Sequence, residues 1–181
     1  MKSRLIDILG SKYCIDILML FLYRPADELY QADIIKQSDL SKMTVIKWLN
    51  FLESHSVLKT VKKGNLKYYS INKENPILKQ LKVMINTMNV YESAEQLSGK
   101  GLEIYLFGSS ARGEDTEHSD IDILIIGKID KHELVKFVDD VKARMRKNVN
   151  PIVMDPFEYS NLYRKDKTFY ENVQRDRIRL I

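Results

Sequence analysis

The chain contains 181 residues, 44% of them hydrophobic and 30% charged, with a formal net charge of +4 at pH 7. That length allows one large domain or two small ones with a packed core. No hydrophobic run approaches the ~20 residues of a transmembrane helix, and Asp7 interrupts the stretch that a signal peptide would need, so we expect no membrane association. The single cysteine, Cys14, cannot form an internal disulfide and is expected to be a buried nonpolar residue, which favours a cytoplasmic location.

The charge is unevenly divided along the chain. Residues 1–90 contain 14 Lys and Arg against 8 Asp and Glu, a net +6, whereas residues 91–181 contain 15 against 17, a net −2. A basic first half and an acidic second half predict two parts with different functions.

Hydrophobic residues three and four positions apart predict helices through most of the first half. The expected elements are a short helix before Gly10-Ser11, a longer helix that ends at Arg24-Pro25, and helices over residues 30–37 and 42–55, the last with Ser41 as its N-cap. Strand-forming residues on both sides of the Gly64-Asn65 turn predict a β-hairpin over residues 58–63 and 66–71. A long helix over residues 76–97 follows, with Pro76 suited to its first turn.

The stretch Ser98–Gly101 is the expected domain boundary. Beyond it, we expect strands over residues 103–107, 121–126 and 149–154, and a last strand within residues 177–181. Helices are expected over residues 131–147, 157–163 and 167–172.

Three helices followed by a basic hairpin resemble the winged helix-turn-helix domain of small bacterial and archaeal regulators. The resemblance lies in residues 41–72, SKMTVIKWLNFLESHSVLKTVKKGNLKYYSIN. The matching positions are Ser41, Thr44, Val45, Leu49, Leu52, Glu53, Gly64, Tyr68 and Tyr69. Ser56 departs from the family, which usually has glycine there.

The residues themselves also favour binding to double-stranded DNA. Met43, Val45, Ile46, Leu49 and Leu52 would form the buried side of the helix over residues 42–55. Lys42, Thr44 and Lys47 would remain on the side that could enter the major groove. Lys62, Lys63 and Lys67 of the hairpin would neutralise phosphates and make the affinity depend on salt. The alternative is a solvated basic face on a domain that binds another protein.

The stretch Gly108–Asp122, GSSARGEDTEHSDID, resembles the signature of the minimal nucleotidyltransferases of the polymerase-β-like superfamily. That signature is Gly-Ser-x-Ala-Arg-Gly, about five polar residues, and Ser-Asp-x-Asp. The resemblance implies a mixed sheet with flanking helices, an NTP as ligand or substrate, and Mg²⁺ or Mn²⁺. It implies Asp120 and Asp122 as catalytic and metal-binding residues, and Gly108, Ser109, Arg112 and Ser119 as nucleotide-binding residues.

The chemistry explains why these residue types recur at this spacing. Acids two positions apart on a strand project from one face, so Asp120 and Asp122 can share metal ions. Gly108 would let the backbone approach a triphosphate closely, and Ser109 would donate its hydroxyl and amide. The Ala111–Gly113 turn is expected to open a short helix. Arg112 would pair either with phosphate or with a nearby carboxylate.

The remaining charged residues of this stretch are expected to be solvated, namely Glu114, Asp115, Glu117 and His118. The resembled family supplies a third carboxylate from a later strand, and Asn150 occupies that position here. Asparagine brings no charge and cannot act as a general base. Asp155 lies five residues further on, on the opposite face of an extended strand, and is not expected to substitute. Metal binding should therefore be weaker than in a complete site.

We expect an α+β protein with two domains: a winged helix-turn-helix domain over residues 1–75 and a nucleotidyltransferase-like domain over residues 100–181, joined by a helix within 76–99. The leading interpretation is a DNA-binding transcriptional regulator whose second domain binds Mg-NTP with degraded catalysis. A homodimer is expected, because winged-helix proteins generally read paired half-sites. The joining helix offers a dimer surface or a cover for its own domain, through Ile77, Leu81, Met84, Ile85 and Met88.

The second interpretation is an active enzyme. It would transfer a nucleoside monophosphate such as AMP from an NTP to a partner protein, as in toxin–antitoxin pairs, or to a small molecule. A third interpretation is a purely structural interaction protein.

Overall fold

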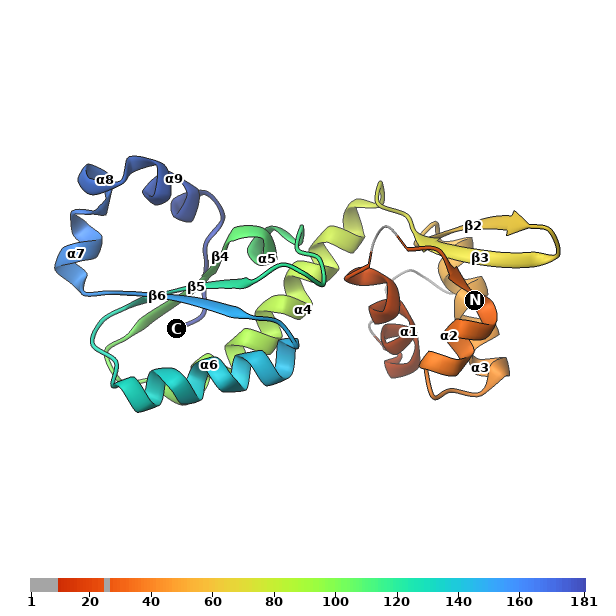
Figure 1. Cartoon of the computed structure of the whole chain (residues 1–181), viewed down its shortest axis with the longest axis horizontal. Coiled ribbons are helices and arrows are strands. Elements are labelled where there is room, and N and C mark those ends of the chain that lie inside the picture. Colours follow the sequence, from red (N-terminus) through yellow and green to blue (C-terminus); the bar gives the residue numbers. More distant parts are fainter. Residues whose placement is uncertain (1–9, 25–26) are drawn as a thin grey trace. The chain divides into compact units, whose positions relative to one another are not determined.

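The computed structural model describes residues 10–24 and 27–181, so the helix expected before Gly10 and the helix-ending Pro25 lie outside the described residues. The chain divides into two compact units, and the boundary along the sequence lies between Leu78 and Lys79 (Figure 1). None of the helices in the described part combines the length and hydrophobicity needed to cross a bilayer.

The first unit contains three helices and a small sheet. The helices are α1 (Lys12–Leu22), α2 (Gln31–Gln37) and α3 (Lys42–Ser54), and the strands are β1 (Leu29–Tyr30), β2 (Leu58–Lys63) and β3 (Leu66–Ile71). The antiparallel sheet has the order β1-β3-β2. The hairpin has the bounds that the sequence predicts. The two-residue strand β1 was not expected, because so short a strand has no detectable alternation.

Helix α3 begins as the sequence predicts, with the Ser41 side chain accepting a hydrogen bond from the Thr44 amide at 3.2 Å. Its buried face carries Val45, Leu49 and Leu52, all with no exposed surface. The expectation that Met43 shares this face is wrong, because Met43 is 77% exposed. Two residues correspond to about 200° around a helix, which places Met43 opposite Val45.

The second unit is built on the four-stranded mixed sheet β6-β5-β4-β7. Its strands are β4 (Glu103–Phe107), β5 (Ile121–Ile126), β6 (Val149–Met154) and β7 (Ile178–Arg179). Only β5 and β6 are parallel. The first three strands have the predicted bounds.

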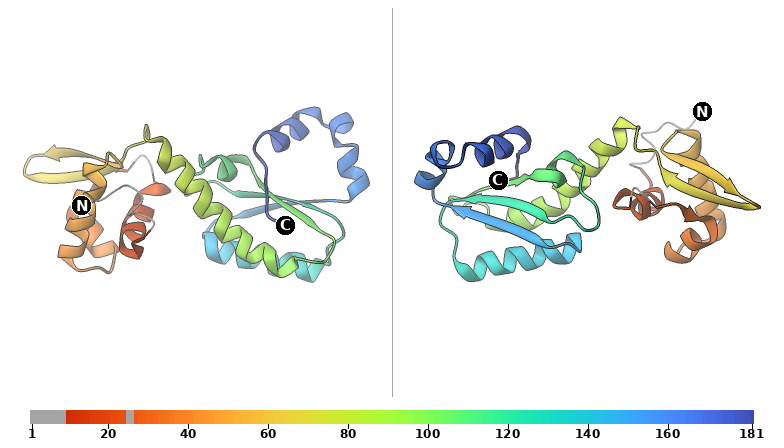
Figure 2. Two further views of the ribbon diagram at one scale, coloured as in Figure 1. Left: turned by 180° about the vertical axis from the view of Figure 1, so that it is seen from behind. Right: turned by 45° about the horizontal axis from the view of Figure 1, so that its top comes forward.

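Two helices cover one face of this sheet, as the view from behind in Figure 2 shows. They are α4 (Pro76–Ala94), which continues into the 3₁₀ turn η2 (Glu95–Leu97), and α6 (Lys131–Met145). Val90 and Ala94 of α4 and Phe137 and Val141 of α6 pack on the inward residues of β4 and β5. The predicted dimer surface on α4 is divided, because Leu81 is buried while Met84 and Met88 are exposed.

Three of the four shorter helices follow β6 on the other face (Figure 1), whereas the fourth, α5 (Gly108–Arg112), follows the end of β4, and its Ala111 belongs to the core on the α4 side. The other three are α7 (Pro156–Ser160), α8 (Leu162–Lys165) and α9 (Lys167–Asp176). Phe169 and Val173 of α9 pack with Phe107 and Leu124 of the sheet. The expectation that the Ala111–Gly113 turn opens a helix is wrong. Helix α5 begins at Gly108 and ends at this turn, with left-handed Gly113 as its C-cap.

Candidate functional site

Three neighbouring strands of the second unit bring one residue each into a row. Antiparallel pairing places Phe107 of β4 opposite Asp122 of β5, and parallel pairing places Asn150 of β6 beside Asp122. Phe107 belongs to the core on the α9 side of the sheet together with Leu124. Residues two apart in a strand share a face, so Asp122 lies on this same side. The row therefore puts Asp122 and Asn150 beside the point where β4 passes into α5.

Gly108, the first residue of α5, is held against this row. Its φ is +72°, and a Cβ added to it would lie 2.5 Å from Oδ2 of Asp122. Side-chain-bearing residues disfavour that backbone conformation, and no heavy atom fits at that distance. The close neighbour that requires a glycine is thus the Asp122 carboxylate of the chain itself.

Asn150 contacts Asp122 directly. Its Nδ2 donates a hydrogen bond to Oδ1 of Asp122 at 3.1 Å. In the described residues, no cluster of three His, Cys, Asp or Glu side chains is arranged to hold a metal. The side chain that contacts Asp122 from β6 is therefore an uncharged amide.

The oxygen donors that are present still suit a hard divalent cation. Asp120 and Asp122 supply carboxylates, and Asn150 supplies an amide oxygen. For that oxygen to be a ligand, the amide must turn, because its nitrogen now faces Asp122. Asp155 is not available as a replacement, since its side chain accepts a hydrogen bond from the Glu158 amide at 2.7 Å in the capping box of α7.

Asp120 and Ser119 lie in the loop just before β5. Asp120 is exposed. The Ser119 hydroxyl accepts a hydrogen bond from the Thr116 amide at 2.9 Å and lies 3.4 Å from the Thr116 hydroxyl. Ser119 therefore closes the turn that leads into β5, and its role toward a nucleotide stays a prediction.

Arg112 forms carboxylate pairs in this structure. Its Nε lies 2.7 Å from Glu114, and its Nη1 pairs with Asp176 of α9. The hydrogen bond from Arg112, together with one from Lys79, lowers the pKa of Glu114 from 4.5 to about 2. Of the two roles expected for Arg112, the structure shows pairing with nearby carboxylates. The pair with Asp176 connects α5 to α9.

Asp115 is fully buried, so the expectation of a solvated residue is wrong. Its carboxylate accepts a hydrogen bond from Asn86 at 2.9 Å, pairs with Lys82 at 3.3 Å, and also pairs with Lys147. Asn86 additionally donates to the backbone oxygen of Ser110 in α5 at 3.0 Å. We call these residues the Asp115 cluster: Lys82, Asn86, Asp115 and Lys147.

The Asp115 cluster holds the loop between α5 and β5 against α4 and the loop between α6 and β6. The sequence analysis missed this cluster because a local pattern cannot show that a residue of a polar loop turns inward. The sequence of α4 nevertheless indicated which side chains could meet such a residue. Lys82 and Asn86 lie eight and four residues before the buried Val90, and therefore on the inward face of the helix. Burial lowers the pKa of Lys82 despite its carboxylate partner.

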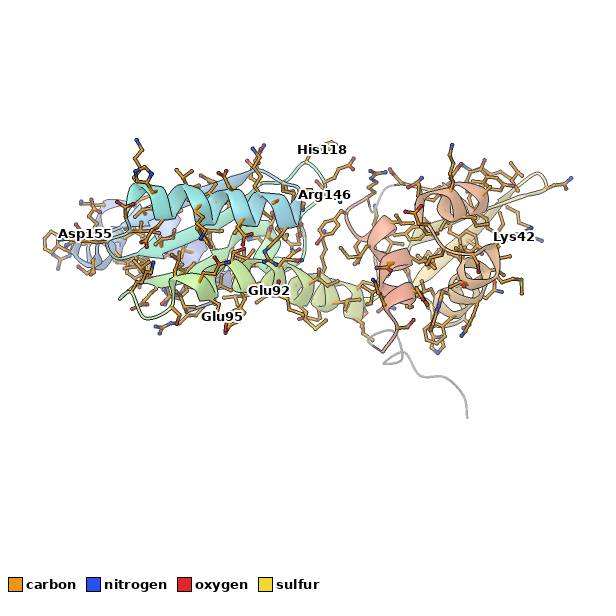
Figure 3. All side chains as sticks on the ribbon, turned by 90° about the horizontal axis from the view of Figure 1, so that it is seen from below. Lys42, Glu92, Glu95, His118, Arg146 and Asp155 are labelled. Carbon is orange, nitrogen blue, oxygen red and sulfur yellow. The ribbon has the colours of Figure 1, made fainter. Side chains whose placement is uncertain are left out.

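A cavity of about 470 Å³ opens beside Asp120. One wall consists of the loop before β5, and the other of the end of α6 and the loop that leads to β6. Figure 3 labels one residue of each wall, His118 and Arg146. The lining residues are Glu117, His118, Ser119, Asp120, Lys142, Arg146, Lys147 and Asn148.

In the first unit, the predicted DNA-contacting residues of α3 differ in their surroundings. Lys42 and Lys47 are exposed, and the Lys47 ammonium lies 4.9 Å from the centre of the Trp48 ring. The Thr44 hydroxyl lies 2.9 Å from the Ser41 hydroxyl, within the helix cap.

Two of the three predicted hairpin lysines form ion pairs. Lys63 lies 2.5 Å from Glu28, and Lys67 lies 2.6 Å from Glu53. The hydrogen bond from Lys67 lowers the pKa of Glu53. Lys62 is exposed, and its side chain forms no ion pair with the residues that the structure describes.

Comparison with known proteins places the second unit in a family. Residues 88–180 match the family described as "Nucleotidyltransferase domain". Two proteins of Methanocaldococcus jannaschii that are provisionally named protein adenylyltransferases are similar to the chain. One is 33% identical over 97 residues, which is 52% of this chain and 88% of that protein. The other is 38% identical over 66 residues, which is 33% of this chain and 45% of that protein.

A solved structure is also similar, a provisionally assigned nucleotidyltransferase from Sulfolobus solfataricus. It is 30% identical and covers 56% of this chain and 80% of that chain, with a TM-score of 0.30. The present chain thus spans less than half of one curated relative and most of the other. The family match extends over more than half of the chain. The chain therefore belongs to the nucleotidyltransferase domain family.

Proposed function

We propose that this protein transfers a nucleoside monophosphate, such as AMP, from a metal-bound NTP to a hydroxyl group of another protein. The single observation that carries the proposal is the contact among Gly108, Asp122 and Asn150 at the end of three strands. The names of the two similar archaeal proteins favour a protein acceptor. We therefore favour an active transferase over a DNA-binding regulator with degraded catalysis.

Each side chain has a defined part in the proposed reaction. Asp120 and Asp122 would hold Mg²⁺ or Mn²⁺, with the Asn150 amide oxygen as a neutral third donor. A bound cation would supply charge neutralisation for the triphosphate and the leaving pyrophosphate. Gly108 leaves room for the Asp122 carboxylate, and Ser109 would donate hydrogen bonds to phosphate. Arg112 would position α5 through Glu114 and Asp176.

Labelled ATP tests the proposal. The full-length chain, Mg²⁺ or Mn²⁺ and a cell lysate should give transfer of label to protein. Asp120→Ala and Asp122→Ala should each reduce the transfer at least 100-fold. Asp139→Asn, an exposed acid on α6, is the matched control and should leave it unchanged. Saturable Mg-ATP binding without transfer would contradict this proposal and would instead favour a regulator that responds to a nucleotide.

We also propose that the first unit is a winged helix over residues 1–75 that binds double-stranded DNA, with 76–99 as a connection and 100–181 as the transferase domain. The support is the order of three helices and a basic hairpin, together with the exposed Lys42, Lys47 and Lys62. Because Lys63 and Lys67 already form ion pairs, each would add less binding free energy on contact with a DNA phosphate. A homodimer would place two such units on paired half-sites.

A DNA mobility-shift series tests this second function. Lys47→Gln and Lys62→Gln should each weaken binding and reduce the salt slope by about 0.9. Lys59→Gln on the same hairpin is the control, because Lys59 pairs with Glu74 at 3.0 Å. Equal effects of all three substitutions would indicate a general charge effect and contradict the proposed surface. Sedimentation with and without DNA reports whether a dimer forms.

A further inference from the structure

Helix α3 presents to solvent an uncharged face that the sequence pattern did not predict. Met43 is 77% exposed, the largest fraction for a large hydrophobic side chain in the part of the chain that the structure describes. Asn50 is also exposed and lies almost two helical turns further on, within about 20° of Met43 around the axis. The buried residues Val45, Leu49 and Leu52 lie on the opposite side of the helix. We call Met43 and Asn50 the outer pair of α3.

The groups of the outer pair are available to another molecule. The Asn50 amide forms no hydrogen bond with the residues that the structure describes, so it can both donate and accept. Ser54, further along the same face, already donates its hydroxyl to the Phe51 carbonyl at 2.8 Å. The Thr44 hydroxyl is likewise held in the helix cap. A partner of this face would therefore meet the free amide of Asn50 and the hydrophobic side chain of Met43.

Cations lie on both sides of the outer pair. Lys42 lies about 100° from Met43 in one direction around the helix, and Lys47 lies about 40° from it in the other. Both lysines are exposed. The Lys47 ammonium lies 4.9 Å from the centre of the Trp48 ring, which is still further round the helix, so this contact draws the charge away from the outer pair. The face thus has a neutral centre and cationic flanks.

This arrangement matches the major groove of double-stranded DNA. A helix in that groove has base edges in front of it and a phosphate strand on either side. Thymine presents a methyl group there, and adenine presents an acceptor and a donor that together suit an asparagine amide. The acid of α3, Glu53, is paired with Lys67 at 2.6 Å, and its charge is therefore offset.

We propose that Met43 contacts the methyl group of a thymine and that Asn50 recognises an adenine, so that the first unit selects A·T pairs at two positions of its site. This inference rests on the proposed binding of double-stranded DNA and adds the bases that are recognised. The outer pair spans about 10 Å along the helix axis, which corresponds to about three base-pair steps. Lys42 and Lys47 would contact phosphates, which positions the helix without reading the sequence.

Base analogues test the inference atom by atom. The full-length chain first selects its preferred site from a random duplex library, and that site is then synthesised with single replacements. Deoxyuridine removes only the methyl group of a thymine, and at the Met43 position it should weaken binding about fourfold. The analogue 7-deazaadenine removes only the N7 acceptor of an adenine, and at the Asn50 position it should weaken binding about tenfold.

Variants of α3 then assign each effect to a side chain. Met43→Ala should abolish the effect of deoxyuridine and keep that of 7-deazaadenine, and Asn50→Ala should do the reverse. Gln37→Ala removes an exposed amide at the end of α2 and is the matched control, which should keep both effects. Thr44→Ser should also keep both, because it retains the hydroxyl of the cap. Thermal unfolding should show that the variants of the exposed outer pair are folded.

The possible failures separate the inference from the proposed function. DNA binding that neither analogue weakens would overturn the inference and leave the proposed DNA binding intact. Analogue effects that persist unchanged in Met43→Ala and Asn50→Ala would do the same. Equal affinity for an RNA duplex of the same sequence would also overturn it, because side chains cannot read the deep, narrow major groove of RNA. Absence of DNA binding at about 50 mM salt would contradict both the inference and the proposed function.

Discussion

At the scale of single residues, Asn150 is the neighbour of Asp122 for which the family resemblance predicts a carboxylate. Its amide donates to Asp122, so the pair is stable without a cation. A carboxylate at the same place would face Asp122 across neighbouring strands and would need a cation to offset the repulsion. The residue therefore changes both the affinity for metal and the stability of the metal-free protein.

Asn150→Asp should raise the Mn²⁺ affinity by about tenfold, equivalent to about 1.4 kcal/mol. The same variant should melt below the natural protein without metal and above it with Mn²⁺. Calorimetric titration and thermal unfolding measure the two effects. Asn65→Asp adds an equal charge at the exposed hairpin turn of the first unit and serves as the control. Equal gains in both variants would show that only the overall charge matters.

Gly108 offers a second test, because the chain supplies a matched glycine. Gly108 and Gly101 have φ values of +72° and +70°, but only Gly108 has neighbours within 4 Å of an added Cβ. Gly101→Ala should cost about 1–2 kcal/mol through backbone strain alone. Gly108→Ala should cost more and should also abolish Mn²⁺ binding, because the new methyl group displaces the Asp122 carboxylate. Chemical unfolding and metal titration of both variants give the comparison, and identical results would contradict the contact.

At the scale of elements, the Asp115 cluster joins the segments that carry the site. Through it, α4 is linked to the loop before β5, to the loop between α6 and β6 and, through the Ser110 backbone, to α5. Buried charges are expensive to remove from water, so the cluster is stable only while its partners are complete. Its integrity should control the position of the start of β5, where Asp120 and Asp122 lie.

Asp115→Asn should destabilise the second unit by about 3–5 kcal/mol, because Lys82 and Lys147 lose their buried carboxylate. Glu133→Gln breaks the exposed pair with Lys100 and should cost less than about 1 kcal/mol. Urea unfolding followed by circular dichroism compares the two. A triple variant with Asp115→Leu, Lys82→Met and Lys147→Met should recover most of the loss. If Asp115→Asn alone were as stable as the natural protein, the Asp115 cluster would not be needed to hold these segments together.

At the scale of the whole molecule, the two compact units carry different charge and different candidate ligands. The first is basic and presents exposed lysines on α3 and the hairpin. The second contains the acids of the proposed metal site together with the cavity beside Asp120. A ligand that binds only one unit should stabilise that unit selectively, since stabilisation follows binding to the native state.

Mn-ATP at about 100 times its dissociation constant should add about 2.7 kcal/mol to the stability of the second unit. Hydrogen exchange should then slow in β4, β5 and α5 and remain unchanged in α1, α2 and α3. Double-stranded DNA should produce the opposite pattern. Equal protection of both units by Mn-ATP would contradict independent ligand sites and indicate coupling between them.

Much of the local structure was determined by sequence. The hairpin around Gly64-Asn65, the cap at Ser41 and the strands 103–107, 121–126 and 149–154 follow from turn chemistry, capping and short-range alternation. The spacing of Gly108, Asp120 and Asp122 also identified the family. These features depend on neighbours within a few residues, which is the range that a sequence pattern reports.

Other features were decided only by the tertiary structure. The burial of Asp115 depends on which neighbouring elements this residue meets. The contact between Asn150 and Asp122 depends on the parallel register of two strands separated by a helix. The cavity beside Asp120 likewise needs the end of α6 to lie against the loop before β5. Contacts between residues about 30 positions apart are made by packing, so no local pattern contained them.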